Sequence, residues 1–192
     1  YTTLFRSAIE VNCAALVFCG PSGIGKSTLA AGFHQRGYRF VADDLCAIAD
    51  HNGSPSVIPG FPRLKLWADS LKKLDTTTDE LQRVRWGADL QKFFLPVENR
   101  FTEPLQVQGV FILDSTNTNH LKLTPLPGNE KIDPLIANSY RMRFLHGLGG
   151  KKEHFKLCAA VAAKAEVCRV CRPKHDFLLD ELMDLVLEQS VS

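Results

Sequence analysis

The chain has 192 residues, 45% of them hydrophobic, which fits one globular domain with a hydrophobic core. Its 23 basic and 21 acidic residues give a formal net charge of +2, so charge offers no argument for a nucleic-acid or anionic-membrane partner. The apolar runs are too short to span a bilayer and no secretory leader opens the chain, so we expect a cytoplasmic protein without a membrane partner.

The first seven residues, Tyr-Thr-Thr-Leu-Phe-Arg-Ser, match the in-frame translation of a common sequencing-library adapter, and no methionine precedes them. We therefore expect residues 1–7 to be a non-native scar and residues 8–192 to form the single domain. Ile9-Glu10-Val11 and the apolar residues 14–19 flank Asn12 and Cys13, a pattern that predicts a β-hairpin.

A glycine-rich loop follows this hairpin, and residues 20–27 fit Gly-x-x-x-x-Gly-Lys-Ser/Thr at every fixed position. The apolar strand 14–19 precedes the loop, and a helix expected over residues 28–36 follows it and closes at Gly37. Glycines let successive N–H groups point into one concavity at the positive end of the helix, where an anion binds. Lys26 is expected to reach the outer phosphates of a nucleotide, and the Ser27 hydroxyl to ligate Mg²⁺. The predicted phosphate-binding residues are Gly20, Pro21, Ser22, Gly23, Ile24, Gly25, Lys26, Ser27 and Thr28.

Strands and helices then alternate along the chain, which predicts an α/β fold with a mixed central sheet flanked by helices. Asn52-Gly53 is a strong hairpin-turn signal between residues 45–49 and 57–58, and prolines 55, 59 and 62 with Gly60 predict a loop. The remaining expected elements are a strand over 38–42, a strand and helix within 64–74, strands over 93–97, 107–113, 121–126 and 167–171, and helices over 132–148, 151–165 and 176–187.

Phosphoryl transfer also needs a carboxylate near the metal and the nucleophile, and two places could supply it. Asp43 and Asp44 follow the strand after the glycine loop and its helix. Asp114 ends the apolar run 110–113, which resembles a Walker B strand. The residues alone leave both places open.

The cysteines predict neither a disulfide framework nor a metal site. Several lie in apolar runs, where they are expected to be buried free thiols. Cys168 and Cys171 are three apart on a predicted strand and so face opposite ways. Trp67 and Trp86 are expected to be packing residues. The six cysteines are Cys13, Cys19, Cys46, Cys158, Cys168 and Cys171.

Residues 14–49 resemble the catalytic domain of HPr kinase/phosphorylase. Gly-Pro-Ser-Gly-Ile-Gly-Lys-Ser-Thr is followed by Arg-Gly-Tyr-Arg-Phe-Val-Ala-Asp-Asp at 36–44, where that family has Arg-Gly-His-x-Leu-Val-x-Asp-Asp. Residues 59–67 resemble a stretch of the shorter HPr-kinase-like proteins, including those encoded with lasso-peptide and other peptide-modification systems. The Glu-Ile-Arg-Gly-Leu-Gly signature of the bifunctional enzyme is absent from this sequence.

The resemblance implies a P-loop, HPr-kinase-like domain that uses ATP and Mg²⁺ to phosphorylate a serine of a protein or peptide, such as an HPr-like phosphocarrier or a modified peptide. It implies Asp43 as general base, Asp44 with Ser27 at the metal, Lys26 at the phosphates, and a homo-oligomer. The missing signature argues against phosphorolysis. Arg63, Arg141 and Arg143 are weaker candidates for phosphate contacts.

Two other functions remain open from the sequence. One is a small-metabolite kinase or an NTPase that uses Asp114 as its metal ligand. The other is a nucleotide-binding module without catalysis.

Overall fold

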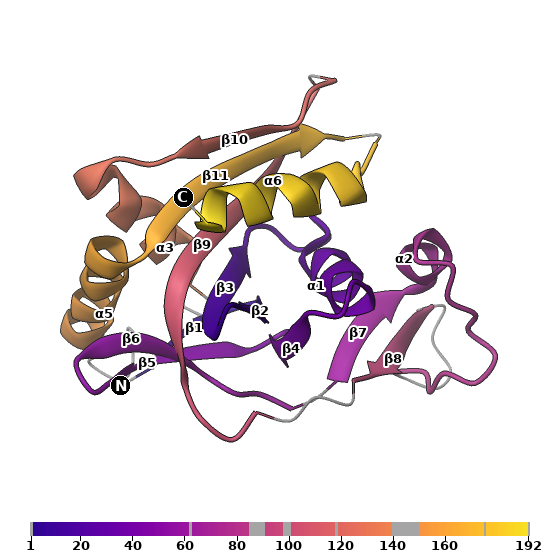
Figure 1. Ribbon diagram of the computed structural model, residues 1–192, viewed down its shortest axis with the longest axis horizontal. Coiled ribbons are helices and arrows are strands. Elements are labelled where there is room, and N and C mark those ends of the chain that lie inside the picture. Colours follow the sequence, from indigo (N-terminus) through magenta and orange to yellow (C-terminus); the bar gives the residue numbers. More distant parts are fainter. Residues whose placement is uncertain are drawn as a thin grey trace.

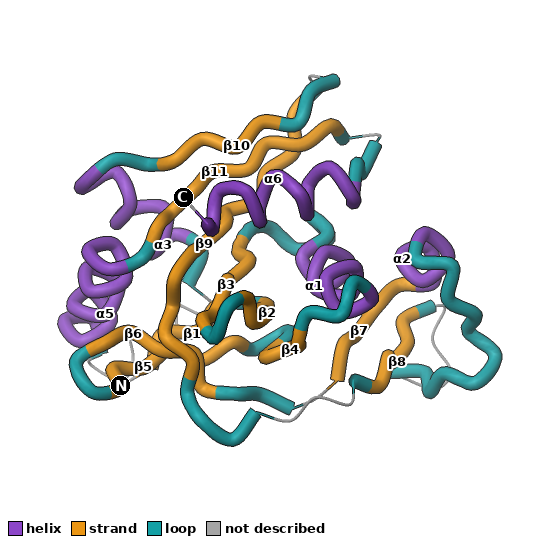
Figure 2. Tube along the Cα trace, viewed as in Figure 1, coloured by secondary structure: helices purple, strands orange, loops and turns teal. Residues whose placement is uncertain are grey.

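The computed structural model describes residues 2–61, 63–84, 91–97, 101–117, 119–139, 150–174 and 176–191. Within these ranges a β-sheet carries helices on both faces (Figures 1 and 2). The strands are β1 (Thr2–Phe5), β2 (Ser7–Val11), β3 (Ala14–Cys19), β4 (Arg39–Ala42), β5 (Cys46–His51), β6 (Ser54–Ile58), β7 (Arg63–Trp67), β8 (Lys92–Pro96), β9 (Leu105–Thr116), β10 (Lys122–Pro125) and β11 (Glu166–Pro173). The helices are α1 (Lys26–Gln35), α2 (Ala68–Lys73), the short 3-10 helix η1 (Gly128–Lys131), α3 (Ile132–Ala137), α5 (Lys151–Lys164) and α6 (Leu179–Val191).

The described strands form a nine-stranded sheet that branches at β9. Its main order is β1-β5-β6-β9-β3-β2-β4, and β11 pairs with β9 and with β10. The β3–β9 and β9–β11 pairings are parallel and the others are antiparallel. Figure 1 shows the long β9 running past both β3 and β11. The predicted mixed central sheet is therefore confirmed.

Each face of the sheet has its own hydrophobic core, as the two-residue period of a strand requires. On β3, Leu16 and Phe18 face the core built with α1 and α6, whereas Val17 and Cys19 face the core built with α3 and α5. Phe18 stacks on Phe33 of α1, with ring centroids 5.7 Å apart. Because both faces of β3 are buried, the sequence of this strand is a continuous apolar run.

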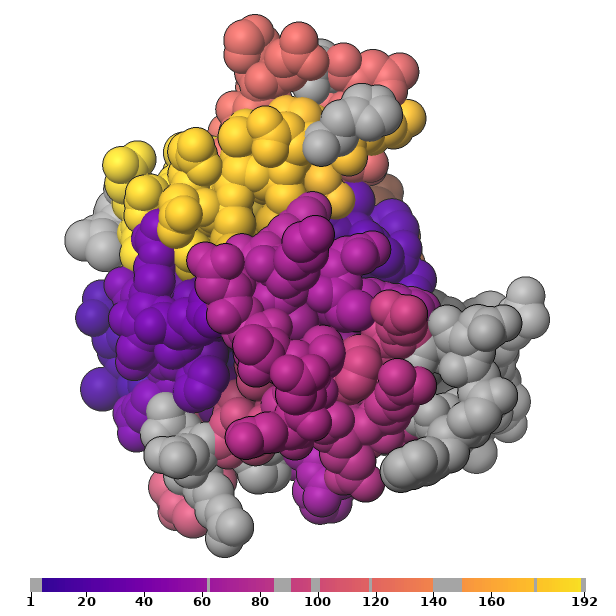
Figure 3. All heavy atoms as spheres, turned by 90° about the vertical axis from the view of Figure 1, so that its right-hand side faces the viewer, coloured from indigo at the N-terminus to yellow at the C-terminus, as the bar shows by residue number. Residues whose placement is uncertain are grey.

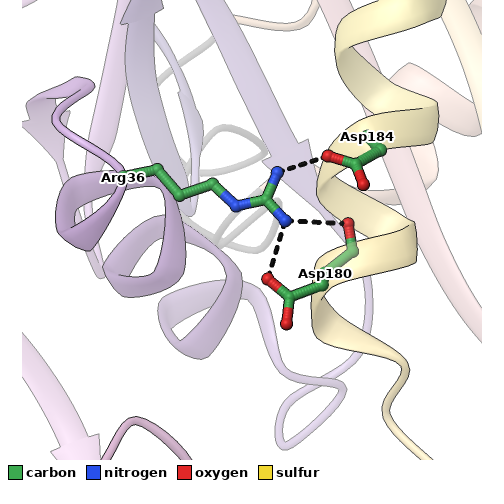
Figure 4. A network of polar contacts seen from close by, with 3 residues as sticks. All are labelled: Arg36, Asp180 and Asp184. Carbon is green, nitrogen blue, oxygen red and sulfur yellow. Dashed lines mark hydrogen bonds and ion pairs between the residues drawn. The ribbon is translucent and has the colours of Figure 1, made fainter.

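Helix α6 packs closely against α1. Gly32 of α1 leaves room for this, because a Cβ there would lie 3.1 Å from both Leu179 and Met183. Arg36, just after α1, binds Asp180 Oδ1 at 2.6 Å and also pairs with Asp184 (Figure 4). Exposed ion pairs contribute less than about 1 kcal/mol each, so apolar packing holds α6 in place.

A separate two-stranded sheet of β7 and β8 lies with α2 beside α1 (Figure 1). Its apolar side chains Leu64, Leu66 and Phe93 join the same core as α1, together with Leu71 of α2. Figure 3 shows this side of the molecule, where these segments lie below the C-terminal residues drawn in yellow. The alternation along β7 leaves Lys65 facing away from that core.

Several expected element boundaries differ from those of the structure, and three concern helices. The helix expected over 132–148 ends at Ala137, where the Asn138 and Ser139 side chains donate to the carbonyls of Pro134 and Leu135. Such side chains compete with helix continuation, and residues 140–149 lie outside the described ranges. The first helix begins at Lys26 rather than 28, and the last begins at Leu179 rather than 176.

The structure also describes Pro55, which was expected in a loop, and most of the expected scar at residues 1–7. Pro55, expected in a loop, is the second residue of β6 and pairs with Asp50 beside the Asn52-Gly53 turn. A proline near the first residue of a strand is compatible with pairing. Within the expected scar, residues 2–5 pair with β5 and Ser7 opens β2.

Candidate functional site

One edge of the sheet collects the ends of several strands. Strand β2 is antiparallel to both β3 and β4, so β3 and β4 point the same way and end at the same edge. Gly20 follows β3 there, and Asp43 follows β4. Strands β9 and β11 run parallel to β3 and end at this edge too. The topology therefore brings the glycine loop close to Asp43, as open α/β sheets do with ligand-binding residues.

The glycine loop forms the turn that its sequence predicts between strand and helix. Gly20, Gly23 and Gly25 have φ of 131°, 81° and 104°, values that other residues rarely adopt. Helix α1 begins directly after the loop, at Lys26. A helix N-terminus has N–H groups without helical partners and the positive end of the dipole, which together suit an anion.

Lys26 folds back over the loop. Its Nζ donates to the carbonyl oxygens of Gly20 and Pro21 at 3.0 and 2.6 Å. The residue is 7% exposed, and burial, with a further contribution from the Arg6 charge, lowers the pKa of Lys26 to about 8. The two carbonyls and the nearby charges of Asp43 and Asp44 offset part of the cost of burying the ammonium group.

Asp43 is half-buried, and three donors hold its carboxylate. Its Oδ1 accepts hydrogen bonds from the hydroxyls of Ser27 at 2.8 Å and Ser7 at 2.6 Å, and its Oδ2 accepts from the Lys65 N–H at 3.2 Å. Burial raises the pKa of Asp43, and these hydrogen bonds oppose the rise. One of these hydrogen bonds joins the Ser27 hydroxyl, at the start of α1, to the end of β4.

Asp44 points elsewhere because the chain turns at this residue. Its φ of 62° is left-handed, which lets two adjacent carboxylates diverge rather than alternate along a strand. Asp44 Oδ2 pairs with Lys65 Nζ at 2.7 Å, and both side chains are partly exposed. Hydroxyl and carboxylate oxygens, such as those of Ser27, Asp43 and Asp44, are ligands that Mg²⁺ prefers.

These groups line a pocket of about 100 Å³ at the N-terminus of α1. Trp67, expected as a packing residue, is 47% exposed and lines this pocket, with Lys92 Nζ 5.8 Å from its ring centroid. Thr28 closes part of the wall through a 2.9 Å hydrogen bond to Ser70. The lining includes Ser22, Gly23, Gly25, Lys26, Ser27, Thr28, Asp43, Asp44 and Lys65.

Three of the predicted loop residues contribute only indirectly. Gly20 and Pro21 offer their carbonyls to Lys26, and the Ile24 side chain is buried in the core below α1. Among the described residues that line the pocket, none of these three is present. Their place in the motif therefore reflects the course of the backbone rather than side-chain contacts.

The other sequence candidates lie apart from the pocket. Asp114 is exposed on β9 and accepts a 2.7 Å hydrogen bond from the N–H of Ser115. Arg63 is exposed on β7, with its guanidinium 5.5 Å from the Phe94 ring centroid. Arg141, Arg143 and Trp86 fall outside the described residues.

The expectation that several cysteines are buried free thiols is confirmed. All six cysteines are free. Cys168 is buried and Cys171 half-buried, as expected for residues on opposite sides of β11. No group of three or more His, Cys, Asp or Glu residues that could hold a metal ion occurs in the part of the chain that is described.

Sequence reasoning missed Lys65, which bridges the pocket to a second hollow. That hollow is a groove of about 780 Å³ that shares Asp43, Asp44 and Lys65 with the pocket. Phe61, which lines it, is 88% exposed. The alternation in residues 63–67 could have placed Lys65 on the polar side of a strand, but nothing local links it to Asp44. The groove is otherwise lined by Leu45, Ala47, Ile58, Pro59, Gly60, Arg63 and Phe94.

No family model matches the chain, and no curated protein sequence matches it. A solved structure of the Hpr(Ser) kinase/phosphatase from Coxiella burnetii is similar, with 14% sequence identity and a TM-score of 0.48, over 98% of this chain and 90% of that one. Across the described ranges, no helix is both long and apolar enough to cross a membrane.

Proposed function

We propose that this protein is a MgATP-dependent kinase that transfers the γ-phosphate to a serine hydroxyl of a protein or peptide. The support comes from the arrangement at one sheet edge: an anion-suited glycine loop, a buried lysine, and two divergent carboxylates. Each has a defined task in phosphoryl transfer, which depends mainly on positioning and on stabilising charge.

The observation that carries the proposal is the 2.8 Å hydrogen bond between Ser27 Oγ and Asp43 Oδ1. It joins a hydroxyl at the start of α1 to a half-buried carboxylate at the end of β4, although the two are 16 residues apart in sequence. A metal and a phosphate at this place would meet oxygen ligands and N–H donors together. The donor set fits Mg²⁺, for which Ser27 and Asp44 are the proposed ligands. Bound there, the ion would neutralise charge on the phosphate oxygens.

Asp43 is the proposed general base. As the serine oxygen forms its bond to the γ-phosphorus and the bond to ADP breaks, the serine proton passes to a carboxylate oxygen of Asp43. Burial raises the pKa of Asp43 toward the working pH, which makes it a better base than an exposed aspartate. The donors on both of its oxygens keep the carboxylate in one orientation.

Lys26 and Lys65 are the proposed cationic groups. Lys26 Nζ is held at the loop by two carbonyls, from which it can swing to the outer phosphates. Lys65 Nζ stands at Asp44, on the boundary between the pocket and the groove. It is therefore placed to meet the phosphoryl group as it passes from nucleotide to acceptor.

The groove favours a polypeptide acceptor over a small metabolite. It is larger than the pocket, is lined mainly by apolar side chains, and opens directly onto Asp43 and Asp44. An extended segment could lie along it with a serine at the carboxylates and apolar neighbours against Phe61 and Phe94. A small polar metabolite would have little use for such a surface.

The test is γ-phosphate transfer from radiolabelled ATP to an array of serine peptides with apolar flanks, with matched alanine peptides as controls. We expect transfer by the wild type with Mg²⁺ and none by Asp43→Asn, although both bind ATP. ATP binding without any transfer would instead indicate a binding module. ATP hydrolysis that Asp43→Asn leaves intact and Asp114→Asn removes would indicate an NTPase.

A further inference from the structure

The C-terminal part of the chain contacts the glycine loop through Arg172 and Phe177. Arg172 of β11 donates from Nε and Nη2 to the carbonyl oxygen of Ile24, at 3.2 and 3.0 Å. Its Nη1 donates to the carbonyl of Pro173 at 2.8 Å. Each of the three guanidinium nitrogens is thus engaged with backbone, and two of them act on the loop.

The Phe177 ring packs against the Arg172 guanidinium group. The Arg172 guanidinium carbon lies 4.7 Å from the Phe177 ring centroid, within cation–π range. The same ring lies against Gly25, where an added Cβ would be 2.4 Å from a ring carbon. Gly25 also has φ of 104°, so it is glycine for two independent reasons. The outer side of the loop therefore packs directly on Arg172 and Phe177.

Because the peptide bond is planar, the hydrogen bonds from Arg172 to the Ile24 carbonyl also fix the direction of the Gly25 N–H. The Ile24 carbonyl and the Gly25 N–H belong to one trans peptide unit, so they point in opposite directions. With the carbonyl held by Arg172, the Gly25 N–H must point away from Arg172. Gly25 lines the pocket and Ile24 does not. No hydrogen bond from the Gly25 N–H to another described residue is present.

We propose that Arg172, seated on Phe177, is a positioning residue that orients the Gly25 N–H toward the phosphates of the bound nucleotide. The inference rests on the proposed function, because it assigns that donor an anionic ligand. A peptide unit already turned toward the anion spares the loop a reorganisation on binding, which is where preorganised sites gain affinity. Arg172 itself does not line the pocket, so it acts through the peptide group rather than on the nucleotide.

The experiment measures binding of inorganic tripolyphosphate and of ATP by calorimetry, at a temperature well below unfolding. Arg172→Met keeps an apolar contact with Phe177 and removes the donors. We expect it to weaken both ligands by about tenfold, equivalent to about 1.4 kcal/mol. Arg169→Met is the matched control, because Arg169 is an exposed arginine on the same strand. It should bind both ligands as the wild type does.

Two further measurements separate orientation from simple charge and from folding. In about 1 M salt the Debye length is about 3 Å, so a field effect of Arg172 would disappear whereas an orienting effect persists. Phe177→Leu leaves the Arg172 charge in place and removes its platform, and we expect it to weaken tripolyphosphate binding as well. This variant keeps the inference testable if Arg172→Met does not fold.

The possible outcomes distinguish failure of the proposed function from failure of the inference about Arg172. If the wild type binds neither ligand, the proposed function fails before Arg172 is considered. If the wild type binds and Arg172→Met equals Arg169→Met, Arg172 has no orienting role. If high salt abolishes the loss of affinity in Arg172→Met, the inference is also overturned, since Arg172 would then act only through its electrostatic field. A deficit that persists in salt and is shared by Phe177→Leu, with unchanged secondary structure, supports it.

Discussion

Two acidic strand ends lie at the same edge of the sheet and differ in almost every physical respect. Asp43 follows β4, is half-buried, and accepts hydrogen bonds from Ser7, Ser27 and the Lys65 N–H. Asp114 lies near the end of β9, is exposed, and accepts from the N–H of the next residue. Both follow apolar runs, so the difference comes from their neighbours and not from the local pattern.

The cause lies in where each strand ends. Strand β4 stops at Ala42, and the left-handed turn at Asp44 lets Asp43 face the glycine loop while β7 approaches through Lys65. Strand β9 continues to Thr116, so Asp114 is still within the strand and alternates outward after the buried Leu113. Asp43 is therefore a site residue because the chain turns beside it, whereas Asp114 stays within its strand. Four predictions test this contrast.

The largest expected effect is on catalysis when Asp43 is replaced. Asp43→Asn should lower kcat for peptide phosphorylation by about 10²–10⁴-fold, the usual contribution of a general base. The Kd for ATP should change little, because the amide keeps the size of the side chain. Initial rates of radiolabel transfer and calorimetry measure the two quantities. Undiminished kcat in this variant would remove Asp43 from the mechanism.

The next largest expected effect is on ATP affinity when Lys26 is replaced. Lys26→Ala should weaken ATP by about 100-fold, since it removes a buried, charge-assisted phosphate contact worth about 3 kcal/mol. Calorimetry or fluorescence titration gives the Kd. Lys122→Ala, which alters an exposed lysine on β10, is the control and should bind normally. Equal Kd values for the two variants would contradict the assignment of Lys26.

A third prediction uses the raised pKa of Asp43. Its folded pKa lies above the unfolded value, so its contribution to stability is fully present below the unfolded pKa and is lost as pH rises through the folded one. Asparagine does not ionise, and the serine hydroxyls can rotate to accept from its amide. The stability of Asp43→Asn relative to wild type should therefore increase from about pH 4 upward, by about 1.4 kcal/mol for each pH unit between the two pKa values.

Urea unfolding of both proteins at several pH values measures this difference. Asp114→Asn, followed in parallel, serves as the exposed reference. A stability difference that moved in favour of the wild type as pH rises would mean that the hydrogen bonds to Asp43 outweigh its burial.

The smallest expected effect is that of Asp114→Asn itself. An exposed side chain bonded to its neighbour's N–H should change unfolding free energy by no more than about 0.5 kcal/mol. ATP affinity and kcat should stay at wild-type levels. Loss of turnover in this variant, with Asp43→Asn unaffected, would exchange the roles of the two strand ends and favour the NTPase alternative.

Much of the local structure could be predicted from short stretches of sequence. The strand, loop and first helix around residues 14–37 follow from apolar runs and glycines, and Asn52-Gly53 marked a real hairpin. Boundaries that depend on single side chains were less predictable. Hydrogen bonds from Asn138 and Ser139 end α3 early, which a periodic apolar pattern does not reveal.

The contacts that build the site were decided by tertiary structure. The motif alone named Lys26 and Ser27, but that Asp43 reaches Ser27 depends on β2 pairing with both β3 and β4. Arg172 reaches Ile24 across 148 residues because β11 joins the sheet through β9. Backbone period and turn chemistry are local properties of the chain, whereas the meeting of distant side chains depends on strand order and on where each strand stops.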